Sequence, residues 1–448
     1  MMVEAPSRSH AIDLEGYAKA IVTYIDDDDY PMSVPADFRS GDSEASVVLD
    51  PISRPPDMHP GRRVTVIFSH IKPVEDFGYV DRRYLTVEGR LEPKGDVFEV
   101  KAERISGWDE SVVPFFEYCE RSVGRGRAYL ESLSRTEGKE IQPRLPLLWK
   151  MFLATRAPFL TATVIPVLLG AAVARWQGYS ASWFTAVALI GASLVHIGLN
   201  MLNDYFDSVS GADQMNVTPT PYSGGSRVLQ YGLVSEKAML GWGAGLMVAG
   251  CVIGVVLSVF RGPALLAIGG IGVLLAFFYT APPLRLAYRG LGDLAVATGF
   301  GPIVVAGSYY VVARKLSIEA LYASIPVAIL VMLILYVNQV PDRNADALAG
   351  KNTVAVRFSR EAILRGYAIA AAAAFLSVVI GVAIGLMPTL ALLSLLPAPL
   401  AIVVYRGMRD NYDSPYGLMP AMSKNIALHG LVGTALTMAY FVSAYFSG

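Results

Sequence analysis

The pattern of hydrophobic residues divides the chain near residue 150. From about residue 153 onward, apolar stretches follow one another at the length of about 20 residues that a helix needs to cross a membrane. We predict nine spanning helices, with approximate bounds 153–174, 181–202, 236–259, 263–281, 291–312, 318–338, 362–386, 389–405 and 426–446. The short connections at 176–180 and 387–388 are alternatively re-entrant turns.

The N-terminal part of the chain has a different pattern. Short segments rich in Val, Ile, Tyr and Phe predict β-strands, and they read AIVTYID, ASVVLD, RRVTVIFSHI, RYLTVEGRLEP and VFEVKAERISGW. The stretch PFFEYCERSVGRGRAYLESLSR then has the period of a helix. Four or more strands and a closing helix predict a small barrel with helices. We interpret the acidic run Asp26–Asp29 as a solvated hairpin turn rather than a metal site.

Charged residues follow the same division. The 448 residues are 53% hydrophobic and 17% charged, which excludes disorder, collagen and a disulfide scaffold. Residues 1–150 carry 20 Lys+Arg and 27 Asp+Glu, whereas residues 151–448 carry only 17 and 11. We therefore predict a cytoplasmic soluble domain over residues 1–134, a linker over 135–150 and a transmembrane domain over 151–448.

The basic residues in the loops predict the orientation, because cytoplasmic loops carry an excess of Lys and Arg. With the N-terminus inside, 12 basic residues lie in cytoplasmic loops and 4 lie opposite. The first residues hold no apolar stretch long enough for a signal peptide. Cys119 and Cys251 are far apart in the sequence, which is typical of a reducing compartment. We predict a multi-pass plasma-membrane protein with cytoplasmic active-site loops, in contact with the lipid bilayer and with no nucleic-acid partner.

Five of the 11 acidic residues after residue 150 lie in two short clusters, at the cytoplasmic ends of the second and sixth predicted helices. The first cluster contains Asn203, Asp204, Asp207 and Asp213, and the second contains Asn338, Asp342 and Asp346. Spacings of four place Asn338, Asp342 and Asp346 on one helical face. Asn203 and Asp207 are likewise four apart, and Asp204 lies three residues before Asp207. A carboxylate in a membrane helix costs about 2.5–3.5 kcal/mol, and five repel one another unless a cation neutralises them. Oxygen ligands without His or Cys suit Mg²⁺, which typically bridges to substrate phosphates.

The loops beside the clusters extend this interpretation. Residues 223–227 (SGGSR) follow the first cluster and residues 350–353 (GKNT) follow the second. Flexible backbone together with the cations of Arg227 and Lys351 is what a diphosphate needs. The alternative is that the acids cap helix ends or pair with Arg343 and Lys351. This is the weaker interpretation, because there are two matched clusters of Asn and Asp.

These residues resemble the UbiA superfamily of intramembrane prenyltransferases, over roughly residues 150–448. The resemblance implies nine transmembrane helices and two Asp-rich motifs that hold Mg²⁺ and a prenyl diphosphate. The segment from Asn203 to Asp207 matches the first motif, and the segment from Asn338 to Asp346 matches the second, with Asn338 where many members have Asp. It implies the metal ligands Asn203, Asp204, Asp207, Asn338, Asp342 and Asp346, of which the four aspartates are the catalytic candidates.

Within the superfamily, the sequence is most similar to the MenA branch, which prenylates 1,4-dihydroxy-2-naphthoate in menaquinone synthesis. The stretches NDYFDSVSGAD and GGSRVLQYGLVS carry this similarity, as does YTAPPL running into RGLGD, where MenA-like proteins more often have Glu at the position of Asp293. We expect the substrates to be bound by Asp213, Arg227, Tyr279, Arg289 and Lys351. Homogentisate or 4-hydroxybenzoate is the alternative acceptor. An ion-coupled transporter and a membrane-anchored flavoprotein are the alternatives outside this chemistry.

Three further residues have open roles. We expect His196 and His429 to be hydrogen-bonding groups between helices rather than bases. Asp293 is expected to orient the acceptor hydroxyl, to cap a helix or to pair with Arg289.

The N-terminal segments YIDDDDYPMSVP, GRRVTVIFSH, VEGRLEP and AERISGW are similar to the split β-barrel of pyridoxamine-phosphate-oxidase-like flavin-binding proteins. The resemblance implies FMN at a dimer interface, with Arg62, Arg63 and Lys72 as phosphate contacts. The alternatives are that these three are exposed strand-edge cations, and that the barrel serves only dimerisation or regulation. The predicted fold class is therefore multidomain, a soluble split β-barrel (α+β) followed by an all-α nine-helix transmembrane bundle of the UbiA type.

Overall fold

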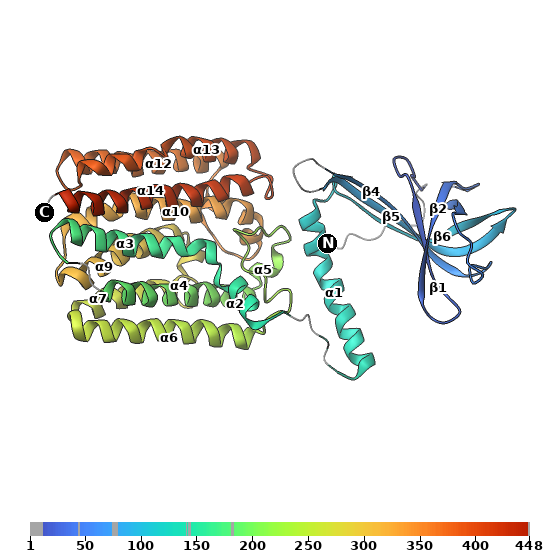
Figure 1. The fold of residues 1–448 in the computed structure, drawn as a ribbon, viewed down its shortest axis with the longest axis horizontal. Helices are drawn as coiled ribbons and strands as arrows, with labels where there is room; N and C mark the ends of the chain where they lie inside the picture. The colour runs from blue at the N-terminus through green and yellow to red at the C-terminus, as the bar shows by residue number, and fades with distance from the viewer. Residues whose placement is uncertain are drawn as a thin grey trace. The chain divides into compact units, whose positions relative to one another are not determined.

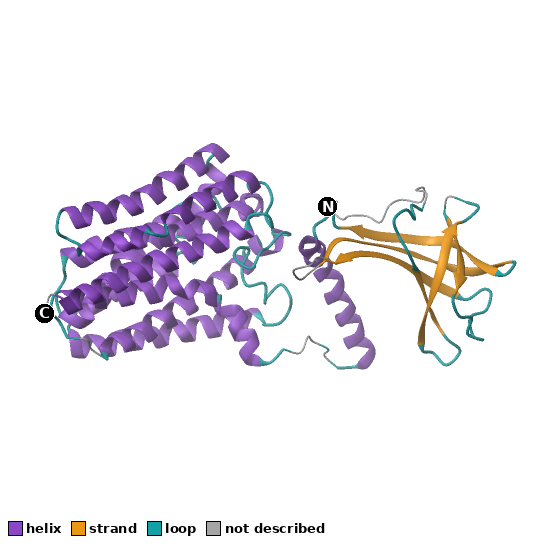
Figure 2. Cartoon of the chain, turned by 45° about the horizontal axis from the view of Figure 1, so that its top comes forward, coloured by secondary structure: helices purple, strands orange, loops and turns teal. Residues whose placement is uncertain are grey.

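The computed structural model describes residues 12–43, 45–73, 79–139, 141, 145–180 and 183–446. The chain divides into two compact units, Met1–Arg121 and Ser122–Gly448. Figure 2 shows the strands in the first unit and a helical second unit.

Six antiparallel strands close a barrel in the order β1-β2-β3-β6-β5-β4. Their bounds are β1 (Ala20–Ile25), β2 (Pro31–Ser40), β3 (Ser46–Pro51), β4 (Arg63–Pro73), β5 (Tyr79–Lys94) and β6 (Val97–Asp109). Side chains alternate along β1, so that Ala20, Val22 and Tyr24 face the core with Phe68 and Leu49. The predicted strand segments are confirmed as an antiparallel sheet.

Strand β2 is the one that the sequence pattern missed. It contains Pro31 and Pro35, and proline within a segment argues against a strand because it lacks the N–H group that the ladder needs. Both prolines nevertheless lie in register opposite β1, Pro31 against Ile25 and Pro35 against Ile21.

The acidic run is confirmed as a hairpin turn between β1 and β2. The Asp26 carboxylate accepts hydrogen bonds from the backbone N–H groups of Asp28 (2.9 Å) and Tyr30 (2.8 Å). The run is largely exposed to solvent, as a solvated turn should be.

The cations considered as phosphate contacts have partners in the barrel itself or are exposed. Arg62 donates to the carbonyl of Ile25 and to the carboxylate of Asp27. A guanidinium nitrogen of Arg63 lies 3.7 Å from the Glu88 carboxylate, and Lys72 is exposed. These contacts fit the interpretation as strand-edge cations.

The helix α1 (Phe115–Glu137) follows β6. Its first residues pack against the strands, since the ring of Tyr118 lies 4.9 Å from that of Trp108 and its hydroxyl is 2.6 Å from the hydroxyl of Tyr84. The indole N–H of Trp108 also donates to the carbonyl of Val113 (2.7 Å), which fixes the turn into the helix.

The second unit is a bundle of helices that run roughly parallel or antiparallel to one another (Figure 1). Their bounds are α2 (Leu147–Thr155), α3 (Thr161–Trp176), α4 (Phe184–Val209), α5 (Ala212–Met215), α6 (Glu236–Arg261), α7 (Ala264–Phe278), α8 (Gly292–Thr298), α9 (Val304–Ala313), α10 (Ile318–Leu348), α11 (Val354–Arg357), α12 (Arg360–Ala383), α13 (Ala398–Asn411) and α14 (Met419–Phe446). Short 3₁₀ turns precede α3, α8 and α13, at Ala157–Leu160, Leu286–Arg289 and Thr389–Leu395.

Eight helices in the described residues are long and apolar enough to cross a membrane. They are Ala157–Trp176, Phe184–Val209, Glu236–Arg261, Gly292–Ala313, Ile318–Leu348, Arg360–Ala383, Thr389–Asn411 and Met419–Phe446. The remaining apolar helix, α7, has 15 residues. Each of the nine predicted stretches overlaps one of these helices, which confirms a helical transmembrane domain, and the count of nine spans stays a prediction because α7 is short.

The largest difference from the predicted bounds is at the end of α10. The apolar pattern ends at residue 338, but the helix continues to Leu348, through Pro341. This extension keeps Asp342 and Asp346 on a regular helix, as their spacing from Asn338 requires.

Glycines and serine caps explain how several helices begin and pack. A Cβ atom on Gly198 of α4 would lie 2.7 Å from the carbonyl oxygen of Gly243 in α6, so only glycine allows this close approach. Ser235, Ser317 and Ser359 each accept a hydrogen bond from the backbone N–H three residues later, which caps α6, α10 and α12.

Helices α8 and α9 form one span that is interrupted by a π-helical turn, Gly299–Ile303. Pro302 lies in this turn and has no N–H group to donate. Such turns occur frequently at functional sites, and this one carries Phe300 toward two cavities described below.

Candidate active site

The C-terminal turns of α4 and α10 face each other across a cavity of about 180 Å³, together with α5 and the loop that follows it. Eight of the 11 predicted site residues line this cavity: Asn203, Asp207, Asp213, Tyr279, Asn338, Asp342, Asp346 and Lys351. Asp204, Arg227 and Arg289 are not among its lining residues in the described chain. The fold thus brings two clusters that are over 120 residues apart in the sequence to one cavity.

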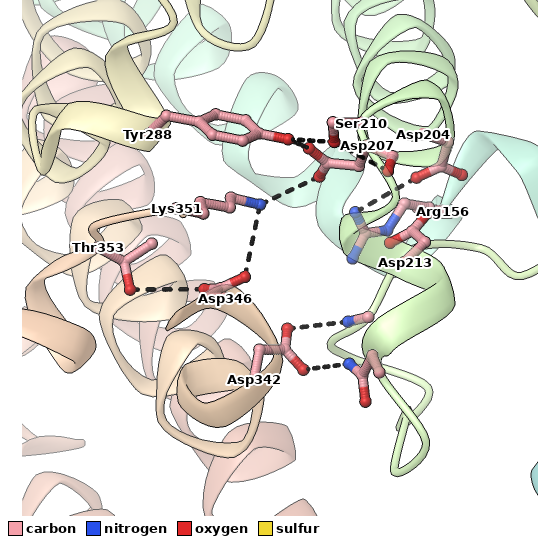
Figure 3. Close-up of polar contacts among 12 residues, drawn as sticks. Arg156, Asp204, Asp207, Ser210, Asp213, Tyr288, Asp342, Asp346, Lys351 and Thr353 are labelled. Carbon is pink, nitrogen blue, oxygen red and sulfur yellow. Dashed lines mark hydrogen bonds and ion pairs between the residues drawn. The ribbon is translucent and has the colours of Figure 1, made fainter. Parts of the chain in front are cut away.

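Asp207 is held by two groups from other parts of the chain (Figure 3). The hydroxyl of Tyr288 donates to one carboxylate oxygen (2.7 Å), and the ammonium of Lys351 donates to the other (3.0 Å). Tyr288 is fixed in turn by the hydroxyl of Ser210 (2.7 Å). The ammonium of Lys351 also lies 3.9 Å from the Asp346 carboxylate, so it links the two clusters.

Asp204, one turn before Asp207 on α4, contacts a different set of groups. Its carboxylate accepts a hydrogen bond from the backbone N–H of Ser226 (3.1 Å), and a guanidinium nitrogen of Arg156 lies 4.0 Å away (Figure 3). Arg156 itself lines the cavity. Asp204 therefore ties the start of the bundle and the glycine-containing loop to the first cluster.

The same loop also binds the second cluster. Asp342 accepts hydrogen bonds from the side-chain amide of Asn216 (2.8 Å) and from the backbone N–H of Gly224 (2.9 Å). Gly224 has φ +76°, and a Cβ there would lie 2.6 Å from the Asn216 amide nitrogen, so this position needs glycine. Asp346 accepts a bond from the hydroxyl of Thr353 (3.4 Å).

Asp213 lies on the short helix α5 and is buried. Burial raises the pKa of its carboxyl well above the ordinary value, and the carboxylates of Asp207 and Asp204 raise it further. The side chain of Arg227 donates to the backbone carbonyl of Asp213 (2.5 Å), and Gln230 donates to its carboxylate (3.3 Å). Arg227 thus shapes the loop from behind the cavity wall.

Negative charge exceeds positive charge around this cavity. Among the residues that the structure describes, its lining includes five carboxyl groups and two cations. The carboxyl groups are those of Asp207, Asp213, Asp293, Asp342 and Asp346, and the cations are Arg156 and Lys351. Burial alone would lower the pKa of Lys351, yet the carboxylates of Asp207 and Asp346 outweigh burial and raise it well above the ordinary value. The excess of acid favours binding of further cations.

Several oxygen atoms fit a divalent cation. The side-chain oxygens Asn203 Oδ1, Asp204 Oδ1 and Asn338 Oδ1 are buried and have no hydrogen-bond partner in the part of the chain that the structure describes. Among the same residues, no three His, Cys, Asp or Glu side chains form a ready metal cage. Mg²⁺ is usually bound by one or two carboxylates together with waters and substrate phosphates, and the orphaned oxygens beside the carboxylates of this cavity fit that ligand set.

A second, larger cavity of about 490 Å³ adjoins the first. Five residues line both: His196, Leu199, Tyr279, Val296 and Phe300. From there the second cavity runs between α4, α6, α7 and α9 as far as Leu265 and Val311. Because Leu265 and Tyr279 lie near opposite ends of α7, the cavity extends for about 20 Å along that helix, with a predominantly apolar lining.

The remaining predicted residues have definite positions. His196 shares a hydrogen bond with Thr163 of α3 (2.7 Å), which confirms its role between helices. For His429 that expectation is wrong within the described residues, where neither ring nitrogen has a partner and the ring is fully buried. Arg289 donates to the carbonyl of Pro283 (3.2 Å).

Sequence reasoning missed Arg156, Asn216, Tyr288 and Gln339, which all lie at or beside the site. Arg156 had a usable signal, since it is a cation near the start of the first predicted span, 153–174. The others had none, because their contacts depend on how distant segments fold together.

Comparisons with known proteins identify the family of the chain. Residues 163–422, more than half of the chain, match the model of the UbiA prenyltransferase family. The chain is 28% identical over 313 residues to the 2-carboxy-1,4-naphthoquinone phytyltransferase of Synechocystis sp., covering 68% of this chain and 98% of that protein. It is 27% identical over 341 residues to the 1,4-dihydroxy-2-naphthoate octaprenyltransferase of Escherichia coli, covering 73% and 97%.

Among solved structures, the apo structure of a UbiA homolog from Aeropyrum pernix K1 matches with a TM-score of 0.48 and 17% identity, covering 63% of this chain and 98% of that chain. The family match, which extends from α3 to the start of α14 and includes both Asp-rich clusters, decides the assignment. The chain belongs to the UbiA prenyltransferase family of integral membrane proteins and is a prenyltransferase.

Proposed function

We propose that this protein transfers a polyprenyl group from a prenyl diphosphate to 1,4-dihydroxy-2-naphthoate, in menaquinone biosynthesis. The observation that carries the proposal is the junction of two cavities, one acidic and polar, the other long and apolar. A prenyl diphosphate has the same two parts. The naphthoate acceptor is supported by the names of the two relatives described above.

The diphosphate belongs at the polar end of this junction. The proposed Mg²⁺ ligands are Asn203, Asp204, Asp207, Asn338, Asp342 and Asp346, and their unpartnered or acidic oxygens fit such ions. Bound there, Mg²⁺ would neutralise the charge that develops on the diphosphate as the allylic C–O bond breaks.

The chain supplies its own positive groups beside these oxygens. Lys351 lies between Asp207 and Asp346, and Arg156 lies beside Asp204, so both can contact a diphosphate that enters the same space. Because both side chains are mostly buried, their charges act in a low dielectric and are worth more than in water. We propose that Asp213, Arg227 and Tyr279 complete the substrate site, the first two by holding the loop 216–234 in place.

Arg289 has weaker support as a substrate contact. Its side chain is exposed and bonds to the chain itself, at the carbonyl of Pro283. We therefore rank it below Arg156 among the cations proposed to contact the diphosphate.

The prenyl chain belongs in the apolar cavity. Its walls are mostly aliphatic side chains and glycines, which exclude water from the reacting carbon. We further propose that α7 is the ninth membrane span, because it forms one wall of this cavity along its whole length. We also propose that the site and the N-terminus lie on the cytoplasmic side of the plasma membrane, which is supported by the excess of basic loop residues at the active-site end.

The N-terminal unit has a separate proposal. Its closed six-stranded barrel supports a relationship to the split β-barrel proteins, and we propose that it forms dimers. FMN in this unit rests on the resemblance alone. Purified protein with a flavin absorption spectrum would support it, and a colourless preparation would count against it.

The experiment that tests the proposed function is an acceptor panel. Membranes containing the protein are incubated with Mg²⁺, a polyprenyl diphosphate and one aromatic acid at a time, and the products are identified by mass. We expect prenylated product from 1,4-dihydroxy-2-naphthoate. If only homogentisate or 4-hydroxybenzoate gives a prenylated product, that compound is the acceptor instead. Ion-dependent uptake without any prenylated product would favour a transporter.

A further inference from the structure

Two buried polar side chains line the polar cavity, and one of them, Asp293, lies one turn before Val296, which lines both cavities. Asp293 lies in the first turn of α8, and Gln339 lies on α10 directly after Asn338. The amide nitrogen of Gln339 donates to both carboxylate oxygens of Asp293, at 3.1 and 3.0 Å. Asp293 is 8% exposed and Gln339 is 6% exposed.

This pair is incompletely satisfied. The amide oxygen of Gln339 is buried and has no hydrogen-bond partner among the described residues. A carboxylate has about four positions that can accept hydrogen bonds, and the two contacts from the Gln339 amide nitrogen do not fill all of them at Asp293. Buried acceptors of this kind are costly in a folded protein unless a ligand or water donates to them. Both residues line the cavity, so a ligand can reach them.

The hydrogen-bonding chemistry of Asp293 and Gln339 indicates which functional group of a ligand they can bind. A diphosphate carries negative charge and no donor, so the carboxylate of Asp293 repels it and the oxygen of Gln339 gives it no partner. A hydroxyl group can bind to either residue, because it donates a hydrogen bond to an oxygen acceptor. The pair therefore does not belong to the diphosphate end of the cavity, where Lys351 and Arg156 lie.

The side chains around the pair indicate that the ligand with this hydroxyl group is aromatic. Rings of His196, Tyr279 and Phe300 line the same cavity, and the rings of His196 and Phe300 lie 4.7 Å apart. His196 is held by its hydrogen bond to Thr163, so its ring is a fixed wall. A flat ring placed beside aromatic side chains makes favourable stacked or edge-to-face contacts.

We propose that Asp293 and Gln339 bind a hydroxyl group of the aromatic acceptor and set its orientation toward the mouth of the apolar cavity. This inference rests on the proposed function and deepens it, because it assigns the acceptor a binding site of its own. The hydroxyl donates to the Asp293 carboxylate or to the free oxygen of Gln339, and the ring lies among His196, Tyr279 and Phe300. Of the roles expected for Asp293, this is hydroxyl orientation, and the structure pairs it with Gln339 rather than with Arg289.

The test separates acceptor binding from donor binding. Steady-state transfer is measured with Asp293→Asn and Gln339→Met, varying the acceptor at saturating donor and then the donor at saturating acceptor. We expect the acceptor KM to rise about tenfold or more while the donor KM stays within about threefold. Lys351→Met should show the reverse pattern. Ser324→Ala on the same helix is the matched control and should change neither constant. Among the described residues its hydroxyl bonds to the carbonyl of Leu321, within its own helix.

The preference for the acceptor over an analogue without free hydroxyl groups is a second measurement. It would not change if Asp293 and Gln339 had only a structural role. A site built to hydrogen-bond a hydroxyl discriminates strongly against an analogue that lacks it. The unsubstituted enzyme should therefore prefer the dihydroxy acceptor to its methyl ethers by about a hundredfold or more, and Gln339→Met should lower that preference at least about tenfold.

A double variant keeps the inference falsifiable if a single variant folds poorly. Asp293→Asn combined with Gln339→Glu preserves an amide–carboxylate hydrogen bond but exchanges its ends. We expect it to restore thermal stability without restoring the acceptor KM. Restoration of both, or an unchanged acceptor KM and analogue preference in the folded single variants, would overturn the inference. Failure of the proposed function looks different, since the unsubstituted protein would then form no prenylated hydroxyaromatic product at all.

Discussion

A glycine on α6 gives a direct test of where the prenyl chain lies. Gly254 lines the apolar cavity, and a Cβ built there meets no atom within 4 Å. Gly254 follows Ile253, which packs against Gly191 of α4. Gly191 lies five residues before His196, so Gly254 is deeper in the cavity than the mouth at His196. Gly254→Leu should therefore fold normally and fill the middle of the cavity.

The expected magnitude follows from the apolar area that the donor can no longer bury. Leucine adds four carbon atoms to the cavity, and each displaced CH₂ group is worth about 0.8 kcal/mol. A long prenyl chain that is excluded from the same volume loses about 3 kcal/mol, which is roughly a hundredfold in kcat/KM. A short donor such as geranyl diphosphate ends before this depth and should lose less than about threefold.

The assay compares kcat/KM for geranyl diphosphate and for a long polyprenyl diphosphate in Gly254→Leu and in a matched control. Gly245→Leu serves as that control, because Gly245 lies on the exposed face of the same helix and its Cβ position is equally open. Both changes have the same intrinsic helix propensity. An equal loss for both donors, or the same loss in Gly245→Leu, would refute the placement of the chain.

The remaining predictions concern the polar end of the site. Lys351→Met removes the ammonium 3.0 Å from Asp207, and we expect the KM for prenyl diphosphate to rise at least about tenfold; an unchanged KM would contradict its role. Tyr288→Phe removes one hydrogen bond to Asp207, worth about 0.5–1.5 kcal/mol, so kcat/KM should fall about two- to tenfold, and full activity would show the bond to be dispensable. EDTA should abolish transfer and added Mg²⁺ should restore it, whereas activity that persists in EDTA would exclude the metal.

The sequence predicted the helical transmembrane domain because hydrophobic length is a strong and local signal. It predicted the end of α10 poorly, since the apolar pattern stops at Asn338 while the helix continues for about three turns. Those turns carry the polar cluster, so the hydrophobic pattern necessarily ends where the site begins. The spacing of Asn338, Asp342 and Asp346 was the better guide, because it already had the period of a helix.

Strand β2 shows a different limit of sequence reasoning. Local propensity rejects a segment with Pro31 and Pro35, but its neighbours β1 and β3 hold it in the barrel. Val34 and Ala36 are buried there and contribute to the core. Tertiary packing has overridden the local preference.

The two clusters were predicted as groups, but not the residues that hold them. Asn216 reaches Asp342 across 126 positions of sequence, and Lys351 reaches Asp207 across 144. Gln339 was hidden because a glutamine within an apolar helix carries no motif of its own. Its orphaned oxygen and its pairing with Asp293 become visible only when the helices are placed in space.

The central claim is that the two clusters act as one diphosphate site. The most direct measurement is the initial rate of prenylated product formation, with Asp207→Asn and Asp342→Asn expressed to matched levels in membranes. Asparagine keeps the size of the side chain and removes its charge, so the bundle should remain intact. The account predicts that each single variant loses at least about a hundredfold in rate. A rate near that of the unsubstituted protein in either variant would contradict it.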